Sequence, residues 1–401
     1  MEWKTVKLGD IIEEISMGPF GSDVKKECYV STGIPILNGS NLQGFKLCED
    51  SFGYLTKEKA DSLGKSNAHR GDIIVTHRGT LGQIVYIPSN SKYERYVISQ
   101  SQFRFRLNER VAIPEYITYY FHTREGQHKL LSNASQVGVP ALARATSTFK
   151  QLEISLPPLK DQKQIAAILS SLDAKIENNA CINANLETQA QTLYKSWFID
   201  FEPFGGSMPD NWKEGKLGEF CKCYLGGTPS RAKKEFWSGN IPWINSGEVN
   251  KYRILEGSEY ITELGLNKSA TKLLPKKTTV LAITGATLGQ VSLLEIDACA
   301  NQSVIGIVEN DVLPYEYIYP MIQNDIKWLI LHQTGGAQQH INKDNVESHE
   351  ILVPSKEVMA EYKQLAAPIY EAIAANCFES QRLATLRDTL LPKLMKGEIE
   401  L

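Results

Sequence analysis

The sequence lacks the motifs that would make it a self-contained enzyme. It contains no Gly-x-x-x-x-Gly-Lys-Ser/Thr loop for a nucleoside triphosphate, and no Gly-x-Gly-x-x-Gly follows a β-rich run. Its double proline, at 157–158, lacks the flanking Asn or Asp and the aromatic residue of an adenine methyltransferase site. The seven histidines are scattered, and no acid, base and nucleophile come together. We therefore predict no catalytic residues.

Features of membrane, secreted and metal-binding proteins are also missing. No apolar run reaches the ~18 residues that span a bilayer, and the first ten residues are too charged for a secretory signal. The seven cysteines are odd in number and include no Cys-x-x-Cys pair. This pattern favours free thiols in a reducing cytoplasm. We expect a cytoplasmic protein with no metal site and no membrane contact.

The chain has no overall excess of positive charge. Its formal net charge is −3, which by itself does not indicate a nucleic-acid binder. Residues 1–150, however, carry 19 Lys and Arg against 15 Asp and Glu, whereas residues 205–355 carry 14 against 17. Any affinity for DNA should therefore be local or supplied by partners. If both parts bind DNA, we expect the isolated first part to show the steeper salt dependence.

The longest element that the sequence predicts is a helix over residues 159–204. No Gly or Pro occurs between Lys160 and Glu202, and prolines lie on either side. About 40 helical residues span roughly 60 Å. Apolar residues recur at heptad spacing in two adjacent rows, which is typical of a coiled-coil seam. The rows are Ile165, Leu172, Asn179, Leu186 and Leu193, and Ile168, Leu169, Ile176, Ile182, Ala190 and Trp197.

This helix has a second copy at 354–401. A shift of 197 residues carries Leu172 onto Ile369 and Asn179 onto Asn376. A buried Asn in a coiled-coil seam fixes its register. Because the Asn lies near the middle of each copy, the helices suit an antiparallel pair with Asn179 and Asn376 near each other. The alternative is two separate amphipathic helices, each packed on its own domain.

The segments between the helices repeat each other as well. Ile-Pro-Ile-Leu-Asn at 34–38 matches Ile-Pro-Trp-Ile-Asn at 241–245, and Thr-Leu-Gly-Gln at 80–83 matches 287–290. Gln100-Ser101 likewise matches Gln302-Ser303. The predicted domains are globular segments at 1–156 and 205–353 and helices at 157–204 and 354–401.

Each globular segment combines short β-rich runs, short helices and polar loops. The β runs are predicted at 72–76, 83–87, 102–107, 280–284 and 290–294. Proline opens a short helix at 114–123 and another at 314–323. The predicted fold class is therefore α+β, with two globular domains joined by two long helices in an antiparallel coiled coil and an internal pseudo-two-fold repeat.

The polar loops carry the side chains that contact bases and phosphates in protein–DNA complexes. The alternative for each residue alone is an ordinary solvated loop, so the clusters carry the prediction. The candidate DNA-binding residues are Ser22, Asn38, Ser40, Asn41, His77, Arg78, Thr80, Gln136, Arg144, Thr228, Ser230, Asn245, Thr284, Thr287, Gln338, Gln339, His340 and Lys343.

Three features together resemble the specificity subunit of a type I restriction–modification enzyme, over essentially the whole chain. One is Trp-Phe-Ile-Asp-Phe-Glu-Pro-Phe at 197–204. Another is the pair of helix entries, Leu-Pro-Pro-Leu and Val-Pro-Ser-Lys, followed by Gln-Lys-Gln-Ile-Ala-Ala and Tyr-Lys-Gln-Leu-Ala-Ala. The third is Arg-Gly-Asp-Ile-Ile at 70–74 with Arg-Gly-Thr at 78–80. The second segment has Gly-Ala-Thr at 285–287 instead, so an arginine contact is not carried over.

The resemblance implies that each globular segment is a target-recognition domain that reads one half of a split sequence in double-stranded DNA. The helices would set the spacing and dock two methylation subunits, and two restriction subunits would complete the enzyme. S-adenosylmethionine, ATP and Mg would bind to those partners, and this chain would bind no cofactor. Aromatic residues at the end of the first helix are the predicted docking surface. They are Tyr194, Trp197, Phe198 and Phe201.

Three other readings stay open at this stage. A self-contained methyltransferase or nuclease would need a catalytic motif that the chain lacks. A coiled-coil scaffold without a DNA role would keep the long helices as its function. A specificity subunit of another class of restriction system would share the same sequence features.

Overall fold

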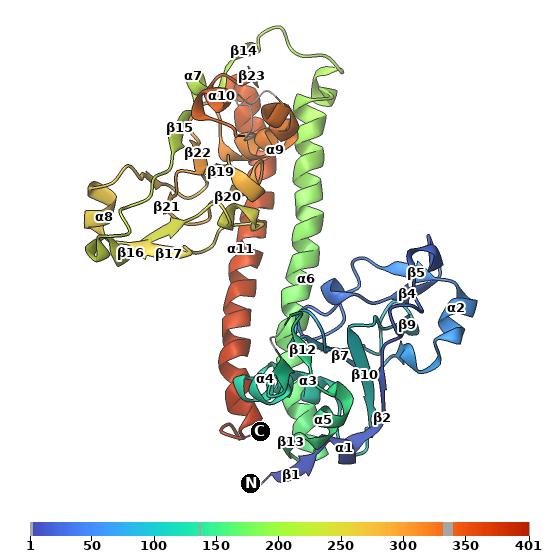
Figure 1. Ribbon diagram of the computed structural model, residues 1–401. Helices are drawn as coiled ribbons and strands as arrows, with labels where there is room; N and C mark the ends of the chain where they lie inside the picture. Colours follow the sequence, from blue (N-terminus) through green and yellow to red (C-terminus); the bar gives the residue numbers. More distant parts are fainter. Residues whose placement is uncertain (1–2, 136–137, 332–339, 401) are drawn as a thin grey trace. The chain divides into compact units, whose positions relative to one another are not determined.

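The computed structural model describes residues 3–135, 138–331 and 340–400 (Figure 1). It divides into two compact units, one formed by Met1–Lys175 with Leu383–Leu401 and the other by Ile176–Arg382. Each unit contains one predicted globular segment and one end of each long helix. The fold is α+β, as predicted, and the two units repeat one arrangement of sheets.

The two long helices are α6 (Leu159–Phe198) and α11 (Lys356–Met395). In the second unit, Asn179 of α6 contacts Ser380 of α11, and one turn later Asn183 contacts Asn376. Residue numbers therefore rise along one helix as they fall along the other. This confirms the predicted antiparallel pairing.

Helix α6 ends at Phe198, six residues before the predicted end at Phe204. The carbonyl oxygen of Lys195 accepts hydrogen bonds from the amides of both Ile199 and Asp200, which closes the last turn. Phe201 then adopts a left-handed φ of 54°, and a short 3-10 turn, η4 (Glu202–Phe204), follows. The absence of Gly and Pro allowed a longer helix but did not require one.

The two predicted register residues both bond side chains of the opposite long helix. The Asn179 amide is fully buried and donates to Glu379 Oε2 at 2.8 Å and Ser380 Oγ at 3.2 Å. Asn376 donates to Asn183 Oδ1 at 2.9 Å. Because Asn183 lies one turn after Asn179, Asn179 and Asn376 lie within about one helical turn of each other across the pair, as expected, although the direct partner of Asn376 is Asn183.

In the first unit, two sheets and two strand pairs form the β structure. The four-stranded sheet has the order β2 (Ile12–Met17), β10 (Gln102–Leu107), β7 (Ile73–Thr76) and β8 (Ile84–Tyr86). The five-stranded sheet has the order β3 (Tyr29–Val30), β5 (Gly53–Leu55), β4 (Ile34–Ile36), β9 (Arg95–Val97) and β6 (Asn67–His69). Strands β1 (Lys4–Lys7) and β13 (Glu153–Leu156) pair, as do the short strands β11 (Ala134–Ser135) and β12 (Ala141–Leu142). The helices are α1 (Leu8–Ile11), α2 (Lys57–Ser62), α3 (Pro114–His122), α4 (Arg124–Leu130) and α5 (Ala145–Gln151).

The second unit repeats this topology. Its first sheet has the order β15 (Lys222–Leu225), β22 (Val304–Val308), β19 (Thr279–Ala282) and β20 (Val291–Leu293). The other sheet has the order β17 (Glu259–Ile261), β16 (Trp237–Ile244), β21 (Ala298–Ala300) and β18 (Leu273–Leu274), and β14 (Lys213–Lys216) pairs with β23 (Glu350–Val353). The helices are α7 (Leu217–Phe220), α8 (Glu263–Asn267), α9 (Tyr315–Leu331) and α10 (Lys343–Glu347).

Helix α9 is longer than the sequence predicted, since it continues through Pro320. Proline has no amide hydrogen, so the carbonyl of Glu316, four residues earlier, loses its helical donor. The Tyr362 hydroxyl of α11 supplies that hydrogen bond, at 3.1 Å. In the first unit the chain instead breaks at Thr123, which adopts an extended conformation and caps α4.

The aromatic residues predicted to dock a partner lie in the core of the second unit. Tyr194, Trp197 and Phe198 are 4–7% exposed, and Phe201 is partly buried against the same cluster. The Phe198 ring lies 4.7 Å from that of Tyr362 and 4.8 Å from that of Tyr317. Their assignment as a docking surface is wrong, because the second unit covers this end of α6.

The Arg-Gly-Asp sequence of the first unit has a structural role. Asp72 is fully buried and pairs with Arg104 at 3.2 Å and Arg106 at 2.7 Å, while Glu14 pairs with Arg104 at 2.7 Å. At the position of Arg104 the second unit has Gly306, against which Leu274 packs. The same sheet is therefore supported by buried charges in one unit and by apolar packing in the other.

Within the second unit, a buried arginine joins the globular segment to α6. The Arg253 side chain is 1% exposed; it donates to Glu187 Oε2 of α6 at 2.9 Å and to the Tyr319 hydroxyl at 3.0 Å. Its guanidinium lies 4.3 Å from the centre of the Tyr252 ring. Glu295 lies 3.7 Å away and also pairs with Lys277 at 2.6 Å.

We expect Arg253→Met to destabilise the second unit by about 3–5 kcal/mol, because Glu187 would remain buried without its cation. Urea unfolding followed by tryptophan fluorescence measures this loss. The control is Arg231→Met, whose arginine is half-exposed and pairs with Glu259; its loss should stay below about 1 kcal/mol. Equal losses for the two variants would contradict this account of Arg253.

Candidate nucleic-acid interface

Four loops of the first unit meet where β2 ends and β10 begins. The Gly18 amide donates to the Gln102 carbonyl at 2.8 Å, which joins loop 18–22 to loop 99–102. A Cβ at Gly18 would lie 1.9 Å from the Ser99 carbonyl oxygen, so a glycine is required here. The chain can make this sharp exit from β2 only because residue 18 has no side chain.

The other two loops join the same place through backbone hydrogen bonds. The amides of His77 and Arg78 both donate to the Ser101 carbonyl, at 2.9 and 3.3 Å. The Leu142 amide donates to the His77 carbonyl at 2.8 Å, which brings in loop 140–144. His77 is half-buried and its Nε2 lies 3.1 Å from the Gln100 carbonyl oxygen; burial lowers its pKa and so favours the neutral ring.

A further loop, 38–41, lies beside this cluster. Gln83 joins it by donating to the Gly39 carbonyl at 2.9 Å. Asn41 is 1% exposed and donates to the carbonyls of Cys48 and Ser51, while its Oδ1 accepts from the Asn38 amide. The prediction that Asn41 contacts DNA is wrong, since all of these groups hold the loop together.

The second unit builds the same arrangement from different side chains. The Gly226 amide donates to the Val304 carbonyl at 3.0 Å, and a Cβ at Gly226 would lie 2.1 Å from the Asn301 carbonyl oxygen. The Ile283 amide donates to the Ser303 carbonyl at 3.0 Å, and the Ile341 amide donates to the Ile283 carbonyl at 3.1 Å. These bonds repeat those of Gly18, His77 and Leu142.

The strand pairing corrects one of the residue correspondences that the sequence repeat suggested between the two units. Thr76 pairs with Gln102 and Ala282 with Val304, so Arg78 is equivalent to Thr284 rather than to Gly285. The extra residue lies in a 3-10 turn, η7 (Gly285–Thr287). Thr287 is the last residue of this turn, and Thr80 is its equivalent in the first unit.

Most of the predicted residues lie on these loops, with different exposure. The exposed ones are Ser22, Asn38, Ser40, Arg78, Thr80 and Arg144 in the first unit and Thr228, Ser230 and His340 in the second. Asn245, Thr284, Thr287 and Lys343 are partly buried, and Lys343 pairs with Glu347 at 3.1 Å. Gln136, Gln338 and Gln339 lie outside the described residues.

Two exposed glutamines were missed as candidates. Gln100 lies on the central loop of the first unit, and Gln302 holds the same place in the second. The Thr228 hydroxyl donates to Gln302 Oε1. The repeated Gln-Ser pair was visible in the sequence, but only the strand pairing shows that it lies between the other loops.

The exposed side chains of these loops offer hydrogen-bonding groups and, at Arg78 and Arg144, positive charge. Among the described residues, no group of three or more His, Cys, Asp or Glu is arranged to hold a metal ion. The helices within those residues include none with the length and apolar character needed to cross a bilayer. The loops therefore form a candidate binding surface in each unit.

A family model for the type I restriction modification DNA specificity domain matches residues 1–188 and 209–379. The chain belongs to this family of specificity subunits. It is 26% identical to the MjaIX specificity subunit of Methanocaldococcus jannaschii, over 99% of this chain and 94% of that one. It is 24% identical to the HindI specificity subunit of Haemophilus influenzae, over 99% of this chain and 100% of that one.

A solved structure supports the fold assignment. The crystal structure of a type I S subunit from M. genitalium matches with a TM-score of 0.62 at 18% identity, covering 98% of this chain and 96% of that one. The two specificity domains matched by the family model each contain one of the four-loop clusters described above.

We expect Gly18→Ala in this specificity subunit to displace loop 18–22 and to cost about 1–3 kcal/mol, because the new Cβ would overlap the Ser99 carbonyl. Faster amide hydrogen exchange at residues 18–22 and a lower urea midpoint would report it. Gly39→Ala is the control, since its Cβ would meet only Gln83 Oε1, at 3.7 Å. Unchanged exchange in Gly18→Ala would show that the close approach is not needed.

Proposed function

We propose that the two loop clusters read the two halves of a split DNA target, one half for each unit. The observation that carries this proposal is the repeated backbone framework with unlike side chains. Gly18 and Gly226 make the same close approach, yet the clusters present Arg78 in one unit and Thr284 at the same place in the other. Two readers of different sequences need this combination of a common framework and different polar groups.

The remaining parts of the enzyme would come from partner subunits. In this proposal two methylation subunits bind S-adenosylmethionine and modify each half-target, and two restriction subunits use ATP and Mg. This chain is the non-catalytic reader and acts in the cytoplasm, where the host DNA lies. The 40-residue helices α6 and α11 set the spacing between the half-targets.

The decisive experiment is methylation mapping of the host genome with and without this chain. We expect one split sequence to lose adenine methylation when the chain is deleted and to regain it on complementation. The purified chain alone should methylate no DNA. Methylation by the chain alone would favour a self-contained enzyme, and an unchanged methylome together with no specific DNA binding would favour a scaffold.

Two arginines of the first cluster should contact phosphates. We expect Arg78→Gln and Arg144→Gln each to reduce the slope of log Kobs against log salt concentration by about 1, in the complex with methylation subunits. Arg110→Gln is the matched control, because Arg110 is exposed beyond the opposite end of β10. A slope unchanged by both substitutions would remove these residues from the interface.

Methylation subunits need a surface other than the buried aromatic cluster. Ile168 of α6 and Leu365 of α11 are 38% and 49% exposed and are equivalent under the 197-residue shift. We propose that each contacts one methylation subunit. The double substitution Ile168→Asp and Leu365→Asp should abolish co-purification with these subunits, while Ile182→Asp, which changes an equally exposed residue of α6, should not.

A further inference from the structure

The most exposed large apolar side chain among the described residues is Phe20, at 82%. It lies at the tip of loop 18–22, within the first loop cluster. At this exposure the ring gains little stability from packing on the described residues of the first unit. A phenyl ring held in water at a candidate DNA-binding surface needs a functional explanation.

The backbone of this loop is held firmly. The Phe20 amide donates to Asp23 Oδ2 at 3.0 Å, and the Asp23 amide donates to the Phe20 carbonyl at 2.9 Å. A Cβ at Gly21 would lie 2.3 Å from Gln100 Oε1, so the loop packs closely on the central loop of the cluster. The ring is therefore presented on a fixed turn, which lowers the entropy lost when it binds a partner.

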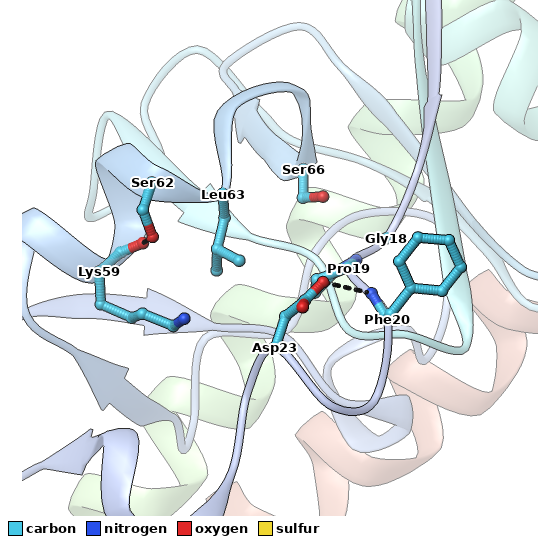
Figure 2. Close-up of a pocket in the computed structure, with 8 residues that line it drawn as sticks. All are labelled: Gly18, Pro19, Phe20, Asp23, Lys59, Ser62, Leu63 and Ser66. Carbon is cyan, nitrogen blue, oxygen red and sulfur yellow. Dashed lines mark hydrogen bonds between the residues drawn. The ribbon is translucent and has the colours of Figure 1, made fainter.

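The surroundings of the ring fit a nucleic acid. Figure 2 shows Phe20 beside a hollow that Lys59 and Ser62 also line, with Asp23 between the ring and Lys59. Lys25 and Lys26 follow the loop and are exposed, and they can contact phosphates. The Asp23 carboxylate accepts the Phe20 amide hydrogen and so serves the turn.

We infer that Phe20 is a specificity-determining wedge, whose ring enters the DNA at a base step and stacks on a base of the half-target read by the first unit. This inference rests on the proposed function. Apolar side chains inserted at base steps unstack the bases locally and bend the duplex. The contact with a base face also stabilises the complex, as aromatic stacking does with single strands.

The equivalent loop of the second unit, at 226–230, carries no such ring. In the equivalent loop Gly226 corresponds to Gly18, so Thr228 takes the place of Phe20. Its hydroxyl donates to Gln302 Oε1, and the pair presents polar groups instead of a ring. This chain therefore reads the two halves of the target differently, and it inserts a ring into only one of them.

The test uses the full chain in complex with its methylation subunits and its mapped target, with 2-aminopurine placed at successive positions. Apart from the adenine that the methylation subunits flip in each half-target, the wild-type complex should raise the fluorescence at one further step, in the half read by the first unit. Phe20→Ala should abolish this signal and weaken binding roughly 10- to 100-fold, whereas Phe20→Trp should retain both. Tyr29→Ala, which removes a ring 47% exposed in the same unit, is the control and should change neither.

The outcomes separate this inference from the proposed function. If the wild-type complex does not distinguish the target from a scrambled duplex, the proposed function fails whatever Phe20 does. If it does distinguish them and Phe20→Ala keeps the fluorescence signal and the affinity, the wedge is refuted. Loss of co-purification with methylation subunits in Phe20→Ala would also refute it, because the ring would then contact protein.

Discussion

The rest of the structure depends on the register of the two long helices, which buried polar contacts set. Asn179 and Asn183 of α6 are buried against α11, and an amide in such a place needs a partner. Sliding one helix by a turn would separate Asn183 from Asn376 and Asn179 from Ser380. The same register brings Arg387 of α11 to Asp173 of α6 in the first unit, where its guanidinium also lies 4.7 Å from the centre of the Phe45 ring. The register of the helix pair therefore determines which side chains of α6 and α11 face each other within each unit.

Within each unit, the interactions that hold the loops at the end of the four-stranded sheet are different from the groups that the loops expose to solvent. The loops are held by backbone hydrogen bonds to one another and to the first residue of β10 or β22, and by a glycine at the exit of the first strand. These interactions do not depend on the exposed side chains, so the exposed side chains can differ. The interior differs as well, since Asp72 and Arg104 support the sheet in one unit and Gly306 with Leu274 in the other. A common backbone with unlike side chains is what two readers of different sequences require.

The aromatic residues show that the sequence alone did not predict which rings are buried and which are exposed. A ring at the end of an amphipathic helix fits a buried core as well as a protein interface, because both exclude water. Tyr194, Trp197 and Phe198 belong to the core, and only the second unit packed around them shows this. Phe20 is the opposite case, since a Phe between Pro and Gly gave no sign that it lies outside the core.

The sequence by itself determined the duplication, the two long helices, the α+β class and the polar loops, because these follow from periodicity and from local turn chemistry, and it favoured the antiparallel pairing of the helices. It also contained the motifs that mark the family. Only the tertiary structure decided the helix register within one turn, the equivalence of Arg78 with Thr284, the burial of Asn41 and the exposure of Phe20. These features depend on which residues, distant in the sequence, contact each other. Strand pairing and packing determine these contacts, and each pairing results from many weak interactions rather than from any one stretch of sequence.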